Sequence, residues 1–272
     1  MVTSGLTIKQ ERKVRLRGIA LPNEHGAWGF LFEPIVAAVA IVPSVPAIFI
    51  ISLFVGAFLT RQPLKVVFSN WRTKRNLPQS TVAIKFVFLY GAIFSLGLAA
   101  CLILSDLKTF IPFALIIPFA IYQIYCDILG KGRQLLAELT GAIAISSSSA
   151  VIALAGGWSF AAAFALWGVF ILRLLPSIVY VRNRLRLEKG KEFSFVSVVT
   201  AHVIAFGAIF TLSVFSLASN LTLAMFAVLL GRAFLGLSPF RKKMKAVKIG
   251  IWEVAYGVLT VLSVIIGYYV GI

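Results

Sequence analysis

The sequence predicts an all-α, polytopic membrane bundle of about nine transmembrane helices. Three observations predict it: 60% of the 272 residues are hydrophobic, only 13% are charged, and the mean hydropathy is +0.97. A soluble domain has about a quarter charged residues, and a disordered chain is poor in apolar residues. The composition therefore excludes a water-soluble enzyme and a disordered chain.

Each predicted helix is an apolar segment of about the 20 residues that a bilayer crossing needs. Several connections between the segments are only a few residues long, such as 43–46 and 156–159, which indicates antiparallel neighbours. In chain order the segments lie near residues 26–43, 45–63, 80–105, 109–129, 135–156, 159–181, 193–218, 220–240 and 248–271.

The distribution of basic residues predicts the orientation. The chain has 26 Lys and Arg residues against 9 Asp and Glu, a net charge of +17. With a cytoplasmic N-terminus and nine crossings, every basic residue except Lys108 falls in or beside a cytoplasmic segment, as the positive-inside rule requires. Topology thus explains the charge, and we expect membrane lipids as partners and no nucleic acid. The expected location is the bacterial cytoplasmic membrane or an equivalent internal membrane, and the oligomeric state stays open.

Residues 1–22 are predicted to form a basic cytoplasmic arm ahead of a transmembrane domain at 23–272. No small-residue cleavage site follows a short apolar core, so the arm is not interpreted as a signal peptide. Two interpretations of the arm remain. It is either a plain solvated segment or an amphipathic helix on anionic headgroups.

Six ionisable side chains are predicted to lie inside the bilayer, on its cytoplasmic side. Charges there cost about 2.5–3.5 kcal/mol each on insertion scales, so they tend to face a cavity or one another. We expect a polar cavity open to the cytoplasm, with apolar packing closing it toward the outside. The alternative is a set of interhelical ion pairs that only holds the bundle together. The six are Glu33, Glu138, Arg173, His202, Arg232 and Glu253.

The stretch NEHGAW at residues 23–28 opens the first predicted helix. Glu24 suits the positive end of the helix dipole, and Trp28 fits an interfacial anchor. His25 and Glu33 are eight residues apart, about 80° around a helix, so both are predicted to line one cavity wall. One His without zinc-protease spacing predicts no metal site. The candidate acid/base groups of the cavity are Glu24, His25, Glu33, His202 and Glu253, and no residue is assigned a catalytic role.

Two arginine-rich segments follow the second and the sixth predicted helices. Arg61 and Lys65 are four residues apart and share a helix face unless Pro63 kinks the helix. Arg182 and Arg186 repeat this spacing. Such clusters can bind phosphate through a bidentate arginine, or they can contact lipid headgroups. The four-residue spacing is compatible with both functions. The predicted ligands of an anion are Arg61, Lys65, Arg173, Arg182 and Arg232.

The stretch at 23–28, followed by Glu33-Pro34, resembles the hallmark of the YwiC-like family of bacterial membrane proteins, and 173–182 and 250–253 support the resemblance. It implies no particular activity. The layout of nine spans is also similar to the UbiA family of intramembrane prenyltransferases, which implies a prenyl diphosphate held by magnesium on two Asp-rich loops. The corresponding segments here, 61–76 and 177–190, contain no Asp. Because magnesium needs oxygen ligands, we expect no such site and no cofactor.

These observations predict a cytoplasm-facing polar cavity for an amphipathic anion, such as a lipid phosphate or an isoprenoid. One class is a binding protein or a metal-independent transferase with a UbiA-like layout. A second class is a secondary transporter of an organic anion, in which an acid such as Glu33 carries the coupled proton. It should show inverted repeats and broken helices near the midplane. A third class is an assembly factor without a ligand, whose cavity is filled by side chains.

Overall fold

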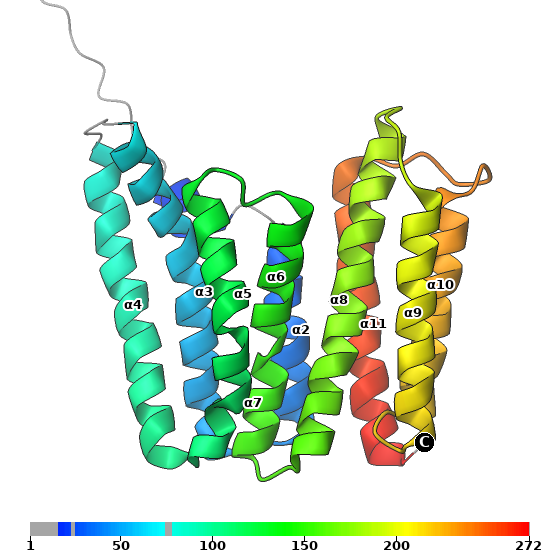
Figure 1. Cartoon of the computed structure of the whole chain (residues 1–272), viewed down its shortest axis with the longest axis horizontal. Coiled ribbons are helices and arrows are strands. Elements are labelled where there is room, and N and C mark those ends of the chain that lie inside the picture. Colours follow the sequence, from blue (N-terminus) through cyan, green and yellow to red (C-terminus); the bar gives the residue numbers. More distant parts are fainter. Residues whose placement is uncertain (1–15, 23–24, 74–77, 272) are drawn as a thin grey trace, which may run out of the picture.

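The computed structural model describes residues 16–22, 25–73 and 78–271, and within these ranges the chain forms helices and no strand. The helices run alternately up and down across one bundle (Figure 1). The first part of the chain forms α1 Leu16–Ala20, α2 His25–Ile41, α3 Val45–Arg72, α4 Pro78–Leu104, the 3-10 turn η1 Leu107–Phe110, α5 Ile111–Ile128, α6 Leu135–Ser146 and α7 Ser148–Ala155.

The second part of the chain forms α8 Phe160–Glu188, α9 Phe195–Val214, α10 Asn220–Leu237 and α11 Ala246–Val270. A serine precedes α8, α9 and α10, and its hydroxyl accepts a hydrogen bond from a first-turn backbone N–H. Such caps satisfy donors that a helix start leaves unpaired. Helix α11 ends at Val270 and is capped by Gly271, whose φ of 70° is a left-handed conformation that glycine adopts without strain.

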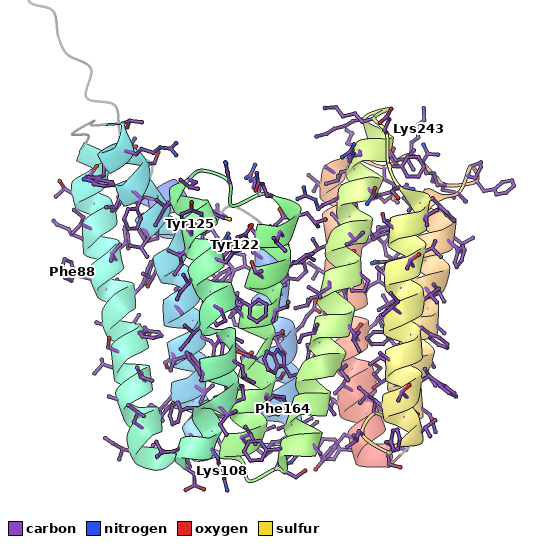
Figure 2. The ribbon with its side chains drawn as sticks, viewed as in Figure 1. Phe88, Lys108, Tyr122, Tyr125, Phe164 and Lys243 are labelled. Atoms are coloured by element: carbon purple, nitrogen blue, oxygen red, sulfur yellow. The ribbon has the colours of Figure 1, made fainter. Side chains whose placement is uncertain are left out.

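Eight helical segments of the described chain are long and apolar enough to cross a membrane, with α6 and α7 together forming one of them. Helix α2 is shorter. Its 17 residues span about 26 Å, close to the thickness of the hydrocarbon core. Large apolar side chains cover the outside of the bundle, as Figure 2 shows for Phe88 on α4. The prediction of an all-α, multi-pass membrane bundle of about nine helices is confirmed.

Several helix ends differ from the predicted ones. Helix α3 runs through Pro63 to Arg72, and α8 runs to Glu188 instead of 181, because their basic last turns stay helical beyond the apolar part. Helix α10 ends at Leu237 instead of 240. The cause is Pro239, since a proline disfavours helical geometry at the residue before it.

The fifth predicted crossing is interrupted at Ser147, between α6 and α7. The serines at 146–149 are fully buried. The hydroxyls of Ser146, Ser147 and Ser149 each donate to a carbonyl three residues earlier, which competes with regular helix geometry. Ser146 Oγ also accepts from Trp167 Nε1 at 3.0 Å, so the interruption is held against α8.

Helix α8 lies at the centre of the bundle. It contacts α2, α6, α7, α9, α10 and α11, and its Phe170 and Leu174 are fully buried. Helix α2 packs against α11, so an early and the last crossing are neighbours. The contacts among α2, α8, α10 and α11 bring together side chains that lie far apart in the sequence.

One end of the bundle carries most of the described basic connections, and we call it the basic end. It is formed by the residues that follow α3, α5, α8 and α10. Lys243 lies at this end and Lys108 at the opposite end, as Figure 2 shows. The positive-inside rule assigns the end that is rich in Lys and Arg to the cytoplasm. The cytoplasmic location of the basic end stays a prediction.

Of the predicted N-terminal arm, residues 1–15 lie outside the described residues. Residues 16–20 form α1, which packs on α3 and α4 with Ile19 and Ala20 buried. Gln62 Nε2 on α3 donates to the Gly18 carbonyl oxygen at 3.0 Å. The described end of the arm is therefore docked on the bundle and is not a plain solvated segment.

Candidate functional site

A single carboxylate, Glu253 on α11, lies between two arginines. Arg173 Nη1 on α8 is 2.9 Å from Oε1, and Arg232 Nη1 on α10 is 2.7 Å from Oε2. Arg173 Nη2 also donates to the Glu253 backbone carbonyl oxygen at 3.1 Å. All three side chains are buried. This arrangement fixes α8, α10 and α11 relative to one another.

Glu33 on α2 adds a second carboxylate to the same group. Its Oε2 is 3.6 Å from Arg173 Nε, too long for a hydrogen bond and short enough for an ion pair. Gly257 of α11 leaves the room for it, because a Cβ at that position would come within 2.0 Å of Glu33 Oε1. Ser177, one turn after Arg173, accepts a hydrogen bond from Arg173 Nη1.

Glu33, Arg173, Arg232 and Glu253 therefore form one connected group, which we call the buried cluster. Its ionised side chains sum to zero charge, which removes the largest electrostatic penalty of placing them in a bilayer. Removing one member leaves an uncompensated buried charge. The cluster is therefore strongly structural, whatever else it does.

Arg232 has hydrogen-bonding capacity that the cluster does not use. Its guanidinium lies between the rings of Tyr180 and Tyr256, 4.3 Å and 4.7 Å from their centroids. Only Nη1 has a hydrogen-bond partner among the described residues, whereas Nε and Nη2 have none. The residue is 9% exposed, so little water reaches these donors. Buried charged donors without partners are costly, and an anion would satisfy them.

A cavity of about 390 Å³ adjoins Arg232. It lies between α8, α10, α11 and the connection after α10, which places it at the basic end. Its lining combines cations, aromatic rings and apolar side chains, a typical composition for a site that takes an amphipathic ligand. The lining residues are Tyr180, Arg184, Arg232, Leu235, Gly236, Ser238, Phe240, Arg241, Lys242, Met244, Ile249, Trp252, Glu253 and Tyr256.

Arg184 on α8 fixes the connection that covers this cavity. Its side chain is fully buried and donates to the carbonyl oxygens of Gly236 and Lys242, the second at 2.6 Å. Glu188 compensates its charge at 2.8 Å. The connection between α10 and α11 is therefore held in place over the cavity by a buried arginine.

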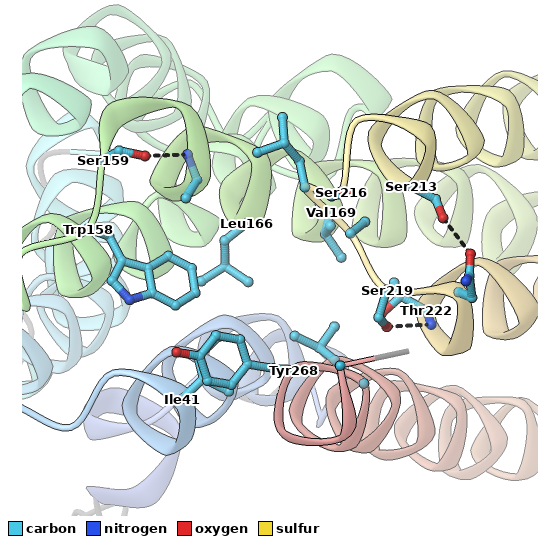
Figure 3. A pocket seen from close by; sticks show the side chains of 17 residues that line it. Ile41, Trp158, Ser159, Leu166, Val169, Ser213, Ser216, Ser219, Thr222 and Tyr268 are labelled. Atoms are coloured by element: carbon cyan, nitrogen blue, oxygen red, sulfur yellow. Dashed lines mark hydrogen bonds between the residues drawn. The ribbon is translucent and has the colours of Figure 1, made fainter.

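A second cavity, of about 620 Å³, lies at the opposite end of α8, α10 and α11 (Figure 3). Its lining has no Lys, Arg, Asp, Glu or His among the described residues. Hydroxyl and amide groups of Ser213, Ser219 and Asn220 line it together with the rings of Trp158 and Tyr268, which stack at 5.5 Å. The surface of this end is therefore partly polar. Apolar packing begins deeper, where Phe170 and Leu229 are buried.

Comparison with known proteins bears on the first half of the chain. Residues 21–153 match the YwiC-like protein family. The predicted resemblance is thereby confirmed over these residues. No curated protein and no solved structure matches the chain, so the UbiA-like layout stays a prediction. The YwiC-like segment contains Glu33, whereas Arg173, Arg232 and Glu253 follow it.

Three predicted anion ligands lie away from the buried cluster. Arg61 and Lys65 on α3, inside the YwiC-like segment, both pair with Asp127 of α5, at 2.5 Å and 3.0 Å. Arg182 on α8 pairs with Glu138 of α6 at 2.8 Å. The structure therefore brings together two of the five predicted ligands, Arg173 and Arg232, and gives the other three carboxylate partners elsewhere at the basic end.

The predicted acid/base groups are divided in the same way. Glu33 and Glu253 belong to the cluster, and His202 lies beside it, with its ring edge-on to Tyr180 at 6.3 Å. His202 Nδ1 is 2.8 Å from the Val198 carbonyl oxygen, which only accepts, so Nδ1 carries the proton. Glu24 and the side chain of His25, at the start of the YwiC-like segment, lie outside the described residues.

Sequence reasoning missed Ser177, Tyr180, Tyr256 and Gly257. A signal was available on α8, where Arg173, Ser177, Tyr180 and Arg184 recur at the spacing of one helix face. Helix α11 repeats it with Glu253, Tyr256, Gly257 and Thr260. Such polar stripes on apolar helices mark faces that turn away from lipid. Within the described ranges, no three His, Cys, Asp or Glu side chains gather as a metal site would require.

Proposed function

We propose that this multi-pass membrane protein binds an amphipathic anion, with a phosphate or carboxylate head and an apolar chain, in the cavity at the basic end. The observation that carries the proposal is Arg232, whose buried Nε and Nη2 have no hydrogen-bond partner among the described residues. A guanidinium presents paired donors that match phosphate and carboxylate oxygens. The anionic head would satisfy both.

The remaining lining supports the same ligand class. Arg241 and Lys242 add positive charge to the lining of the cavity, and Leu235 and Trp252 offer an apolar surface to a chain. Arg173 acts through Glu253, because it holds the carboxylate that in turn orients Arg232. We assign Arg173, Glu33 and Glu253 to positioning and Arg232 to direct contact with the anion.

Binding is supported more directly than group transfer. The one carboxylate among the described lining residues is Glu253, and each of its oxygens is paired with an arginine. A carboxylate held in this way is a poor general base, because proton uptake would leave two buried arginines less compensated. We propose that the basic end faces the cytoplasm of a bacterial membrane, so that the anion is bound on that side.

Native mass spectrometry of the purified protein with its co-purifying lipids tests the proposal. We expect an anionic amphiphile to remain bound to the wild type and to be lost from Arg232→Gln. The matched control is Arg186→Gln, which removes the same charge from an exposed arginine at the same end. Equal retention by wild type and Arg232→Gln would refute the assignment of the site.

Transport of the same anion is a second candidate, favoured by the second cavity. The two cavities are bounded by the same three helices at opposite ends, and the buried cluster lies between them. Flux of a labelled alkyl phosphate from proteoliposomes would test this. If the protein transports, filling the second cavity with Ala162→Trp should stop flux and leave binding at the basic end intact. Absence of flux in the wild type would leave binding as the function.

A further inference from the structure

Two helices that line the cavity at the basic end, α10 and α11, also face the outside of the bundle. Two of its lining residues, Leu235 on α10 and Trp252 on α11, are 69% and 50% exposed, so the cavity reaches the outer face of the bundle. The neighbouring Ile251 is 64% exposed on the same helix. An outer face of this kind on a membrane-crossing helix faces lipid chains. The cavity is therefore continuous with the lipid-facing surface.

The aqueous side of the cavity is covered. The connection at 238–245 contributes Ser238, Phe240, Arg241, Lys242 and Met244 to the lining. Buried Arg184 donates to the carbonyl oxygens of Gly236 in the last turn of α10 and of Lys242 in the middle of the connection. A ligand that arrives from water must pass this connection. From the side of the bundle, by contrast, the lining residues Leu235 and Trp252 are exposed.

The depth of Arg232 matches a lipid headgroup. It precedes Leu237, the last residue of α10, by five residues, which is about 8 Å along the helix axis. This depth lies near the boundary between headgroups and chains and well above the bilayer midplane. The covering connection has the composition of an interfacial segment, since Phe240 is 92% exposed among Arg241, Lys242, Lys243 and Lys245.

We infer that the ligand of this cavity is an anionic phospholipid of the leaflet at the basic end, which enters sideways between α10 and α11. Its phosphate lies against Arg232 and one acyl chain runs along Trp252. The inference rests on the proposed anion site and adds the source of the ligand and its route. Phe240 anchors the covering connection in the interface, and its lysines attract anionic headgroups to the opening.

Quenching of tryptophan fluorescence by brominated lipids tests the route. The full chain is reconstituted in phosphatidylcholine vesicles that contain either brominated phosphatidylglycerol or brominated phosphatidylcholine at the same fraction. The contribution of Trp252 is the difference between the wild type and Trp252→Phe. We expect about a fivefold preference of this site for the anionic lipid, since one basic residue near a membrane surface contributes about that factor. Arg232→Gln should lose the preference, and Arg186→Gln should keep it.

A competing water-soluble anion separates the inference from the proposed function. Hexyl phosphate is added to the same vesicles, and its binding is measured for the wild type and for Arg232→Gln. If hexyl phosphate binds through Arg232 while Trp252 shows no preference for brominated phosphatidylglycerol, sideways entry is overturned and the anion site stands. If binding of neither hexyl phosphate nor the anionic lipid depends on Arg232, both the sideways entry and the proposed anion site are overturned. Displacement of the anionic lipid by hexyl phosphate in the wild type alone would support both.

Discussion

The two cavities lie at opposite ends of α8, α10 and α11, and their polar groups are used differently. In the second cavity three serine hydroxyls are already occupied, since Ser159 and Ser219 cap helices and Ser213 donates to Asn220 at 2.8 Å. At the basic end two donors of Arg232 have no partner among the described residues. A polar lining alone therefore does not mark a binding site. What distinguishes the basic end is a buried, charged side chain with unpartnered donors beside a cavity.

The largest loss of stability is expected from Glu253→Gln, which removes a charge from the buried cluster. It leaves two buried arginines with reduced compensation, and breaking a buried pair in this way costs about 3–5 kcal/mol. The midpoint of thermal unfolding in a neutral detergent should fall strongly. The control is Glu138→Gln, because the pair of Glu138 with Arg182 is partly exposed and such pairs contribute about 0–1 kcal/mol. A similar fall of the unfolding midpoint in both variants would mean that the buried cluster contributes no more to stability than the partly exposed pair.

A smaller effect is expected from Gly257→Ala. The new methyl group would overlap the Glu33 carboxylate and push it away from Arg173, an overpacking effect of about 1–3 kcal/mol. The matched control on the same helix is Gly250→Ala, which meets nothing within 4 Å and should gain up to about 1 kcal/mol of helix propensity. Chemical unfolding of both variants measures the contrast, and two stabilised variants would show that Glu33 does not need this space.

The smallest effect is expected at the opposite end, from Ser216→Gly. Ser216 follows α9 in a left-handed conformation with φ of 56°, and Leu217 N–H donates to the Leu212 carbonyl oxygen at 2.8 Å, the pattern of a Schellman cap. Glycine adopts this conformation without strain, so the variant should gain about 0.4–1 kcal/mol in unfolding free energy. Ser216→Ala keeps the strained conformation and should show no gain. A loss of stability in Ser216→Gly would indicate that the hydroxyl has a structural role in the second cavity.

The sequence predicted the membrane fold well because each crossing must be long and apolar by itself. It also predicted the four cluster members, since an ionisable residue inside an apolar segment is conspicuous in isolation. The sequence did not predict which ionisable residues pair with each other. Arg61 was expected to contact an anionic ligand, yet the carboxylate of Asp127 lies beside it, 66 residues away in the sequence. Only the packing of α3 against α5 creates that pair.

A polar cavity was predicted, but the residues that line it could not be, for a related reason. Tyr180 and Tyr256 are ordinary residues in a membrane helix, and their role appears only when α8 and α11 place both rings around Arg232. The end of α10 was also predicted too late. The apolar run suggested that this helix continues to 240, whereas Pro239 ends it at Leu237.

Arg232 is proposed to hold an anionic head at the basic end. Equilibrium binding of an alkyl phosphate to the purified protein in a neutral detergent tests it most directly, with the wild type, Arg232→Lys and Arg232→Gln compared. A hydrogen bond to a charged group contributes about 1.5–3 kcal/mol, so Arg232→Gln should bind about tenfold or more weakly, with Arg232→Lys in between. Equal affinity of the three proteins would contradict the claim.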